Sequence, residues 1–197
     1  AASDVYKRQD TDRCINFDRQ RNEIKAYDKS PDELKGLQGE KVIYSWKFKL
    51  SNDFQSSKKF THIHQIKAVG GTEDAMPLIT FTTRKGTPDQ LELRYSESTS
   101  QVTLTEVDLA PFKGSWIEAT ETVVYGEKGI GSYKVILQDY NTDTILLTYE
   151  TSDIRMWKTE ADFMRPKWGI YRSLVYVEDL KDEAVLFADF NIKEIEN

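Results

Sequence analysis

Residues 60–95 read FTHIHQIKAVGGTEDAMPLITFTTRKGTPDQLELRY, and this is the most informative pattern in the chain. Runs rich in β-branched and aromatic residues, at 60–68, 78–84 and 90–95, alternate with VGGTEDAMP and RKGTPD, which carry the Gly, Pro and Asp residues that turns favour. The same pattern continues on both sides. Further strands are expected at 41–50, 101–107, 116–125, 132–140, 144–150, 167–177 and 184–192.

Short strands separated by turn residues predict an all-β fold built from two stacked antiparallel sheets. Helical spacing is rare, and only SPDELKGL at 30–37 and TEADFM at 159–164 suggest short helices. We expect a single domain over residues 10–197. Residues 1–9 are set aside as a non-native or disordered segment, because AASDVYKRQ resembles translated adapter sequence.

Composition narrows the classes of function. The chain has 197 residues and a formal net charge of −6, which argues against a nucleic-acid partner because phosphate binding needs a broad basic surface. No apolar run is long enough to span a membrane, and we expect a monomer without a membrane partner. Cys14 is the single cysteine, so an intrachain disulfide and a cysteine-based zinc site are excluded. The first ten residues lack the pattern of a secretory signal.

Alternation along three strands places polar side chains in rows, because residues i and i+2 of a strand point the same way. In the 60–68 run, Gln65 and Lys67 share a face with Ile63, whereas His62 and His64 take the opposite face unless a β-bulge turns one of them. The other two rows are Lys167, Gly169, Tyr171 and Ser173, and Arg19, Arg21, Glu23 and Lys25. If these rows meet on one sheet, they form a charged groove.

Three motifs in these strands resemble those of the jelly-roll polysaccharide lyases, which include alginate lyases, glucuronan lyases and heparin lyase I-like enzymes. RQRNEIK at 19–25 resembles their Arg-x-Glu-x-Arg strand, HQIK at 64–67 their Gln-Ile-His strand, and KWGIYR at 167–172 their Lys-x-Gly-x-Tyr strand. The resemblance spans residues 13–192 and implies a concanavalin-like β-jelly roll. It further implies β-elimination on a uronic-acid-containing polysaccharide, an anionic substrate met outside the cell, so that secretion is expected.

The chain departs from the alginate lyase pattern at two positions. Lys25 stands where those enzymes have a second Arg, and Lys67 stands where they have the His that serves as base. The identity of the base is therefore open. The resemblance implies no required cofactor and leaves open a structural calcium ion, toward which Asp189 offers one carboxylate of the six or more oxygens that such a site needs.

A lyase of this kind must neutralise the C6 carboxylate of a uronate, remove the C5 proton and protonate the departing oxygen. Arg21 and Gln65 are the candidates for gripping the carboxylate, since Arg forms strong charge-assisted pairs. Tyr171 is the candidate general acid and a candidate base, with Lys67, Lys167 or His64 able to share the second role. Further candidates for substrate binding are Glu23, Lys25, Lys167 and Arg94.

Each candidate also has a structural interpretation. Tyr171 could pack in a strand, Gln65 and Lys67 could face solvent, and His64 could be a hydrogen-bonded core residue. The whole chain could be a non-catalytic carbohydrate-binding module, since one fold serves many functions. A glycoside hydrolase is a weaker alternative, because no strand presents the closely spaced carboxylates that such an enzyme needs.

Overall fold

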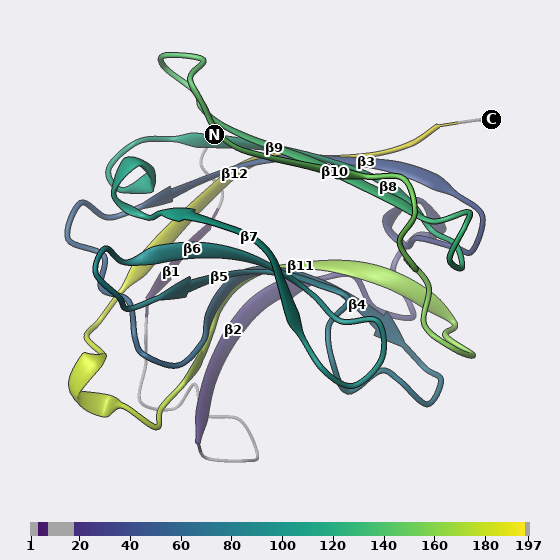
Figure 1. Ribbon diagram of the computed structural model, residues 1–197, viewed down its shortest axis with the longest axis horizontal. Helices are drawn as coiled ribbons and strands as arrows, with labels where there is room; N and C mark the ends of the chain where they lie inside the picture. Colours follow the sequence, from purple (N-terminus) through teal and green to yellow (C-terminus); the bar gives the residue numbers. More distant parts are fainter. Residues whose placement is uncertain (1–3, 8–17, 196–197) are drawn as a thin grey trace.

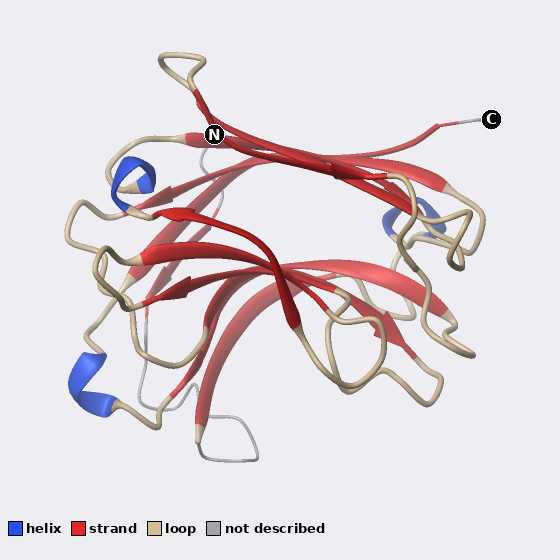
Figure 2. Cartoon of the chain, viewed as in Figure 1, coloured by secondary structure: helices blue, strands red, loops and turns tan. Residues whose placement is uncertain are grey.

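The computed structural model describes residues 4–7 and 18–195, with side chains from residue 18 onward; Cys14 and most of the segment 1–9 lie outside this part. Its strands form two six-stranded antiparallel sheets stacked face to face (Figures 1 and 2). The strands are β1 (Asp4–Lys7), β2 (Arg19–Lys25), β3 (Lys41–Leu50), β4 (Thr61–Val69), β5 (Ile79–Arg84), β6 (Gln90–Tyr95), β7 (Val102–Asp108), β8 (Ile117–Val124), β9 (Ser132–Asp139), β10 (Ile145–Thr151), β11 (Phe163–Ser173) and β12 (Ala184–Ile195).

The order of strands identifies the sheet that carries the polar rows. The back sheet has the order β1-β12-β3-β8-β9-β10, and the front sheet has the order β2-β11-β4-β5-β6-β7. The predicted all-β jelly roll of two antiparallel sheets is therefore confirmed. The three strands with polar rows, β2, β11 and β4, are direct neighbours, so the rows do meet on one sheet.

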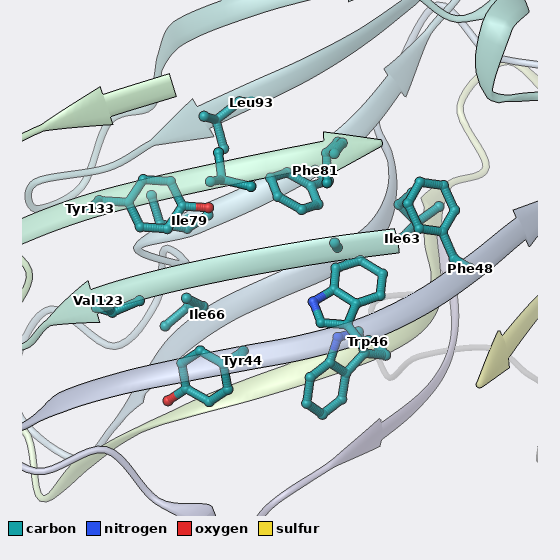
Figure 3. Close-up of a cluster of buried hydrophobic side chains, with 14 of the residues drawn as sticks. Tyr44, Trp46, Phe48, Ile63, Ile66, Ile79, Phe81, Leu93, Val123 and Tyr133 are labelled. Carbon is teal, nitrogen blue, oxygen red and sulfur yellow. The ribbon is translucent and has the colours of Figure 1, made fainter. Parts of the chain in front are cut away.

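Alternating burial explains why the sheets stack. Every second residue of β3, from Val42 through Tyr44, Trp46 and Phe48 to Leu50, is fully buried, while the intervening residues are half-buried. Ile66, Phe81 and Leu93 face them from the front sheet, as Figure 3 shows. Burial of this apolar layer stabilises the sandwich and leaves the other face of the front sheet for polar side chains.

The predicted helices are mostly wrong. Within 30–37 there is one 3-10 turn, η1 (Asp32–Leu34), and the stretch 159–164 is not helical because β11 already begins at Phe163. Two further 3-10 turns, η2 (Ala110–Phe112) and η3 (Val177–Asp179), complete the helical content of the described residues. Tertiary pairing overrides weak local helix signals in both stretches.

The amino-terminal segment contributes one strand. β1, which lies within the residues set aside by sequence, pairs antiparallel with β12 from Asp4 opposite Phe187 to Lys7 opposite Ala184. The back sheet thus gains an edge strand from this segment.

The expected face assignment in β4 is wrong at its amino-terminal half. The pairing of β4 with β5 shifts register between His62 and His64, which is the signature of a β-bulge. Ile63 and His64 both lie in the core (Ile63 is visible in Figure 3), whereas His62 turns to the outer face together with Gln65. The bulge thus places Ile63 and His62 on the faces of the sheet opposite to those that simple alternation assigns to them.

In the described part of the chain, no helix is long and apolar enough to cross a bilayer.

Candidate functional site

A pocket of about 270 Å³ opens on the outer face of the front sheet, over β2, β11 and β4. The loop that connects β4 to β5 forms one wall through Ala75, Met76 and Pro77. The side chains from the three strands are Arg19, Arg21, His62, Gln65, Lys67, Lys167 and Tyr171. The pocket therefore brings together residues that are up to 152 positions apart in the sequence.

Tyr171 lines this pocket with cations around its ring. Arg19 donates a hydrogen bond from Nη1 to the phenol oxygen at 3.0 Å, and the Arg21 guanidinium carbon lies 4.1 Å from the ring centroid. On the other side, Phe60 packs against the ring with the centroids 5.1 Å apart. Cation–π and packing contacts hold the ring of Tyr171 where the residue lines the pocket.

A buried carboxylate holds several of the side chains that line the pocket. Glu23, whose side chain is 3% exposed, is paired with Lys167 Nζ at 2.5 Å and with Arg21 Nε at 3.4 Å, and it accepts a short hydrogen bond from the amide of Gln65. Buried charges are stable only when they are paired in this way. Glu23 thus fixes the positions of three cleft side chains that come from three different strands.

The sequence itself matches a known protein family. Residues 1–191 match the family described as polysaccharide lyase. The chain belongs to this family. The jelly roll, the family match and the pocket agree, and the protein is a polysaccharide lyase.

Several solved structures with a similar fold are lyases. The endo-β-1,4-glucuronan lyase from the fungus Trichoderma reesei has a TM-score of 0.62 and 16% identity, over 88% of this chain and 74% of that one. A family 7 alginate lyase, A1-II', has a TM-score of 0.62 and 15% identity, over 94% and 75%. The marine PL-14 alginate lyase from Aplysia kurodai has a TM-score of 0.54 and 14% identity, over 78% and 69%. At these identities the likeness shows the fold. No curated protein matched the sequence.

His64, one of the predicted candidates for the base, does not reach the pocket of the lyase. Its ring is 1% exposed and lies between the sheets, with Nε2 3.0 Å from Glu121 Oε1 and its ring centroid 4.8 Å from that of Trp46. The β-bulge places His62 in the pocket instead, where its ring stacks on Phe60 at 4.6 Å. His64 is therefore a core residue, and the assignment of His64 to the site is corrected.

The environment of the pocket lowers the pKa of three of its side chains. Burial, and then the nearby cations with Arg84 foremost, lowers the pKa of His62 to about 3, so its imidazole is neutral. Burial also lowers the pKa of Lys167 to about 8, against the opposing influence of Glu23. The pKa of Lys67 is lowered by burial as well. Perturbed titration of several groups in one concave pocket is typical of a functional site.

Three of the predicted substrate-binding residues, Glu23, Lys25 and Arg94, do not line this pocket. Glu23 acts on it only through its contacts with Lys167, Arg21 and Gln65. Lys25 stands opposite Lys167 in the pairing of β2 with β11, but it is exposed and lines a neighbouring, mainly apolar pocket. Arg94 is on the same face as Gln65, two strands away through Thr80. Its guanidinium donates to Glu92 at 2.7 Å and to Thr103 at 2.9 Å. Lys25 and Arg94 therefore flank the pocket along the sheet.

Sequence reasoning missed two site residues, Arg19 and His62. Arg19 stands two positions before Arg21 in the same row, so the alternation contained the signal. His62 is missed because the register shift that turns it outward is not encoded in the alternation of residue types. The pocket wall at 75–77 follows from tertiary packing of a loop.

No group of three or more His, Cys, Asp or Glu side chains in the described residues could hold a metal ion. Asp189, the one carboxylate considered for calcium, is ion-paired with Lys47 at 2.9 Å.

Proposed function

We propose that this lyase cleaves a uronic-acid-containing polysaccharide, such as a glucuronan, alginate or heparin-like polymer, by β-elimination in the pocket around Tyr171. The observation that carries the proposal is the convergence in one pocket of a tyrosine, a neutral histidine and an amide with several cations. Strands β2, β11 and β4 direct one carboxylate, Glu23, to this face. The cations on the same face are Arg19, Arg21, Lys25, Lys67, Arg165 and Lys167. Although the chain carries a net charge of −6, this surface attracts anions.

The reaction divides into three tasks that these side chains can perform. Arg21 and Gln65 bind the C6 carboxylate and stabilise the negative charge that develops on it. A base removes the C5 proton, whose bonding electrons form the C4–C5 double bond. The C4–O bond breaks with its electron pair on the glycosidic oxygen, and Tyr171 donates its proton to that oxygen.

His62 is the base that the geometry favours. It is neutral, it faces the pocket, and its ring centroid lies 5.7 Å from that of Tyr171. Its low pKa reflects burial first and then the cations around it. A bound substrate carboxylate would offset those charges and raise the basicity of the imidazole. Lys167 is a poorer base because its ammonium is paired with Glu23.

The two alternative functions fit the pocket less well. A carbohydrate-binding module is not favoured, because the chain belongs to a lyase family and the pocket gathers titratable groups. A glycoside hydrolase needs two carboxyl groups flanking the bond, whereas the described lining of this pocket contains no Asp or Glu.

Three further features are part of this proposal. The substrate is an anionic polymer, the enzyme acts as a monomer, and it acts outside the cell, where such polymers occur. The reaction as written uses side chains of the chain and requires no cofactor.

The experiment that tests the proposal measures ultraviolet absorbance of unsaturated uronate products. The purified protein is incubated with glucuronan, mannuronate-rich and guluronate-rich alginate, a heparin-like polymer and a pectic polymer. A rise in absorbance with at least one polymer is expected, and the active polymer identifies the substrate. A folded protein that releases no unsaturated product from any of these polymers would contradict the proposal.

Tyr171→Phe locates the reaction in this pocket. The variant keeps the ring contacts with Arg21 and Phe60, so the fold should persist while turnover falls more than about a hundredfold. Tyr140→Phe is the matched control, since Tyr140 is exposed and contacts Lys47 of the back sheet. Near-normal turnover of Tyr171→Phe would end the assignment of Tyr171 as the acid.

A further inference from the structure

The hydrogen bond between Arg19 and Tyr171 has a fixed direction. A guanidinium has N–H groups and no acceptor, so Arg19 Nη1 donates and the phenol oxygen accepts at 3.0 Å. The proton of Tyr171 must then point elsewhere, and Tyr171 is a lining residue of the pocket. Because its oxygen accepts from Arg19, the hydroxyl of Tyr171 keeps its proton available for a different partner.

The other charged or titratable groups around Tyr171 contact its ring. From β2, the Arg21 guanidinium lies over the ring face at 4.1 Å from the centroid. From β11, Lys167 Nζ lies 6.0 Å from the centroid, and from β4, the ring of His62 lies 5.7 Å away. Among the described residues, the bond from Arg19 is the one that reaches the phenol oxygen.

Arg19 is itself held in place at the rim of the pocket. Its Nε donates to Asp18 Oδ1 at 3.1 Å, while Nη1 reaches Tyr171, so the guanidinium bridges the two side chains. The Arg19 side chain is 37% exposed and the Asp18 side chain 48%. A pair this exposed contributes little to stability, which favours a role in the site over a role in the fold.

We propose that Arg19 is a positioning residue for proton transfer by Tyr171. When the O–H bond of Tyr171 breaks and the proton moves to the glycosidic oxygen, the electron pair stays on the phenol oxygen, and Arg19 donates to the phenolate that results. Charge-assisted hydrogen bonds to an anionic oxygen are about twice as strong as neutral ones. This inference rests on the proposed β-elimination and adds a residue that stabilises one of its intermediate states.

The kinetic test separates positioning of Tyr171 from binding of substrate. Arg19→Gln removes the charge, and we expect kcat to fall by about tenfold to a hundredfold with KM changed less than about threefold. Arg19→Lys should recover part of the loss, and millimolar guanidinium should partly restore Arg19→Ala. Lys128→Gln, which removes an exposed charge from the turn between β8 and β9, should behave like the unaltered enzyme. A rise in KM with kcat unchanged, or no change in either, would overturn the inference.

A measurement that does not need activity keeps this inference distinct from the proposed function. In protein labelled with carbon-13 at tyrosine Cζ, the Tyr171 resonance is identified by its loss in Tyr171→Phe. It should move in Arg19→Gln and stay unchanged in Lys128→Gln. An unmoved resonance would refute the Arg19 contact even if the enzyme is active. A moved resonance in a protein that makes no unsaturated product would refute the elimination reaction while supporting the contact.

Discussion

Replacing Glu121 with Ala tests whether a buried polar cluster fixes the strand that carries His62. Glu121 of β8 is fully buried, accepts hydrogen bonds from Trp46 at 3.0 Å and Tyr133 at 2.7 Å, and lies 3.0 Å from His64 Nε2. The substitution leaves these groups without their partner. Each of these three buried groups costs about 1–3 kcal/mol when it is left without a partner. We therefore expect a loss of about 3–5 kcal/mol in the free energy of unfolding.

The assay is urea unfolding followed by tryptophan fluorescence. With a slope of about 2–3 kcal/mol per molar urea, the midpoint should fall by about 1–2 M. Glu121→Gln is the matched variant, because its amide can still contact the same donors, and it should lose clearly less. A loss below about 1 kcal/mol for Glu121→Ala would refute the idea that the cluster stabilises the sandwich.

The same cluster makes the stability of the fold depend on pH in a predictable direction. Burial alone would raise the pKa of Glu121, but His64 and the hydrogen-bond donors outweigh burial and hold the pKa below its usual value. A lowered carboxyl pKa in the folded state stabilises the fold above the unfolded pKa, and that stabilisation is lost as pH falls through the folded value. The stability gap between the unaltered enzyme and Glu121→Gln should therefore narrow in acid and stay constant near neutrality.

Further predictions concern the pocket. Gly169→Ala, at φ +145° and against the backbone of Asn22, should destabilise the fold by about 1–3 kcal/mol and lower turnover by separating β2 from β11, as urea unfolding and steady-state kinetics would show. The KM for the anionic polymer should rise above about pH 8 as Lys167 loses its proton, and Lys167→Gln should abolish that dependence. His62→Gln should lower kcat by about a hundredfold or more with circular dichroism unchanged. Added salt should raise KM at constant kcat, because it screens the cations of the pocket.

How far the sequence predicts the fold depends on the kind of signal. Strand positions follow from alternation and turn residues, and the strands expected at 41–50, 90–95 and 101–107 agree closely with β3, β6 and β7. The helices expected at 30–37 and 159–164 rest on short local sequence patterns, which are weak signals. Pairing of β11 with β4 up to Phe163 opposite Val69 is a long-range interaction that no local signal encodes.

In the candidate site, too, local patterns predict some features, whereas others depend on how the strands pair. The rows on β2 and β11 alternate regularly, so Arg21, Glu23 and Tyr171 could be placed on one face from the sequence. In β4 the bulge changes the face of His62. The sequence indicated only that a bulge, if present, would turn one of the two histidines, and it did not indicate that a bulge is present. Roles that depend on which residues touch, such as the bond from Arg19 to Tyr171, require the register between strands.

The bulge in β4 links the packing of the core to the placement of His62 in the pocket. It directs two successive residues, Ile63 and His64, to the core, where His64 contacts Glu121 of the opposite sheet. Because side chains of a strand otherwise alternate, two inward residues in succession leave His62 and Gln65 together on the outer face. The buried pair of His64 and Glu121 thus stabilises the register that puts a neutral imidazole beside Tyr171. A change in the core at Glu121 should consequently impair turnover as well as stability, even though Glu121 lies on the sheet opposite to the pocket.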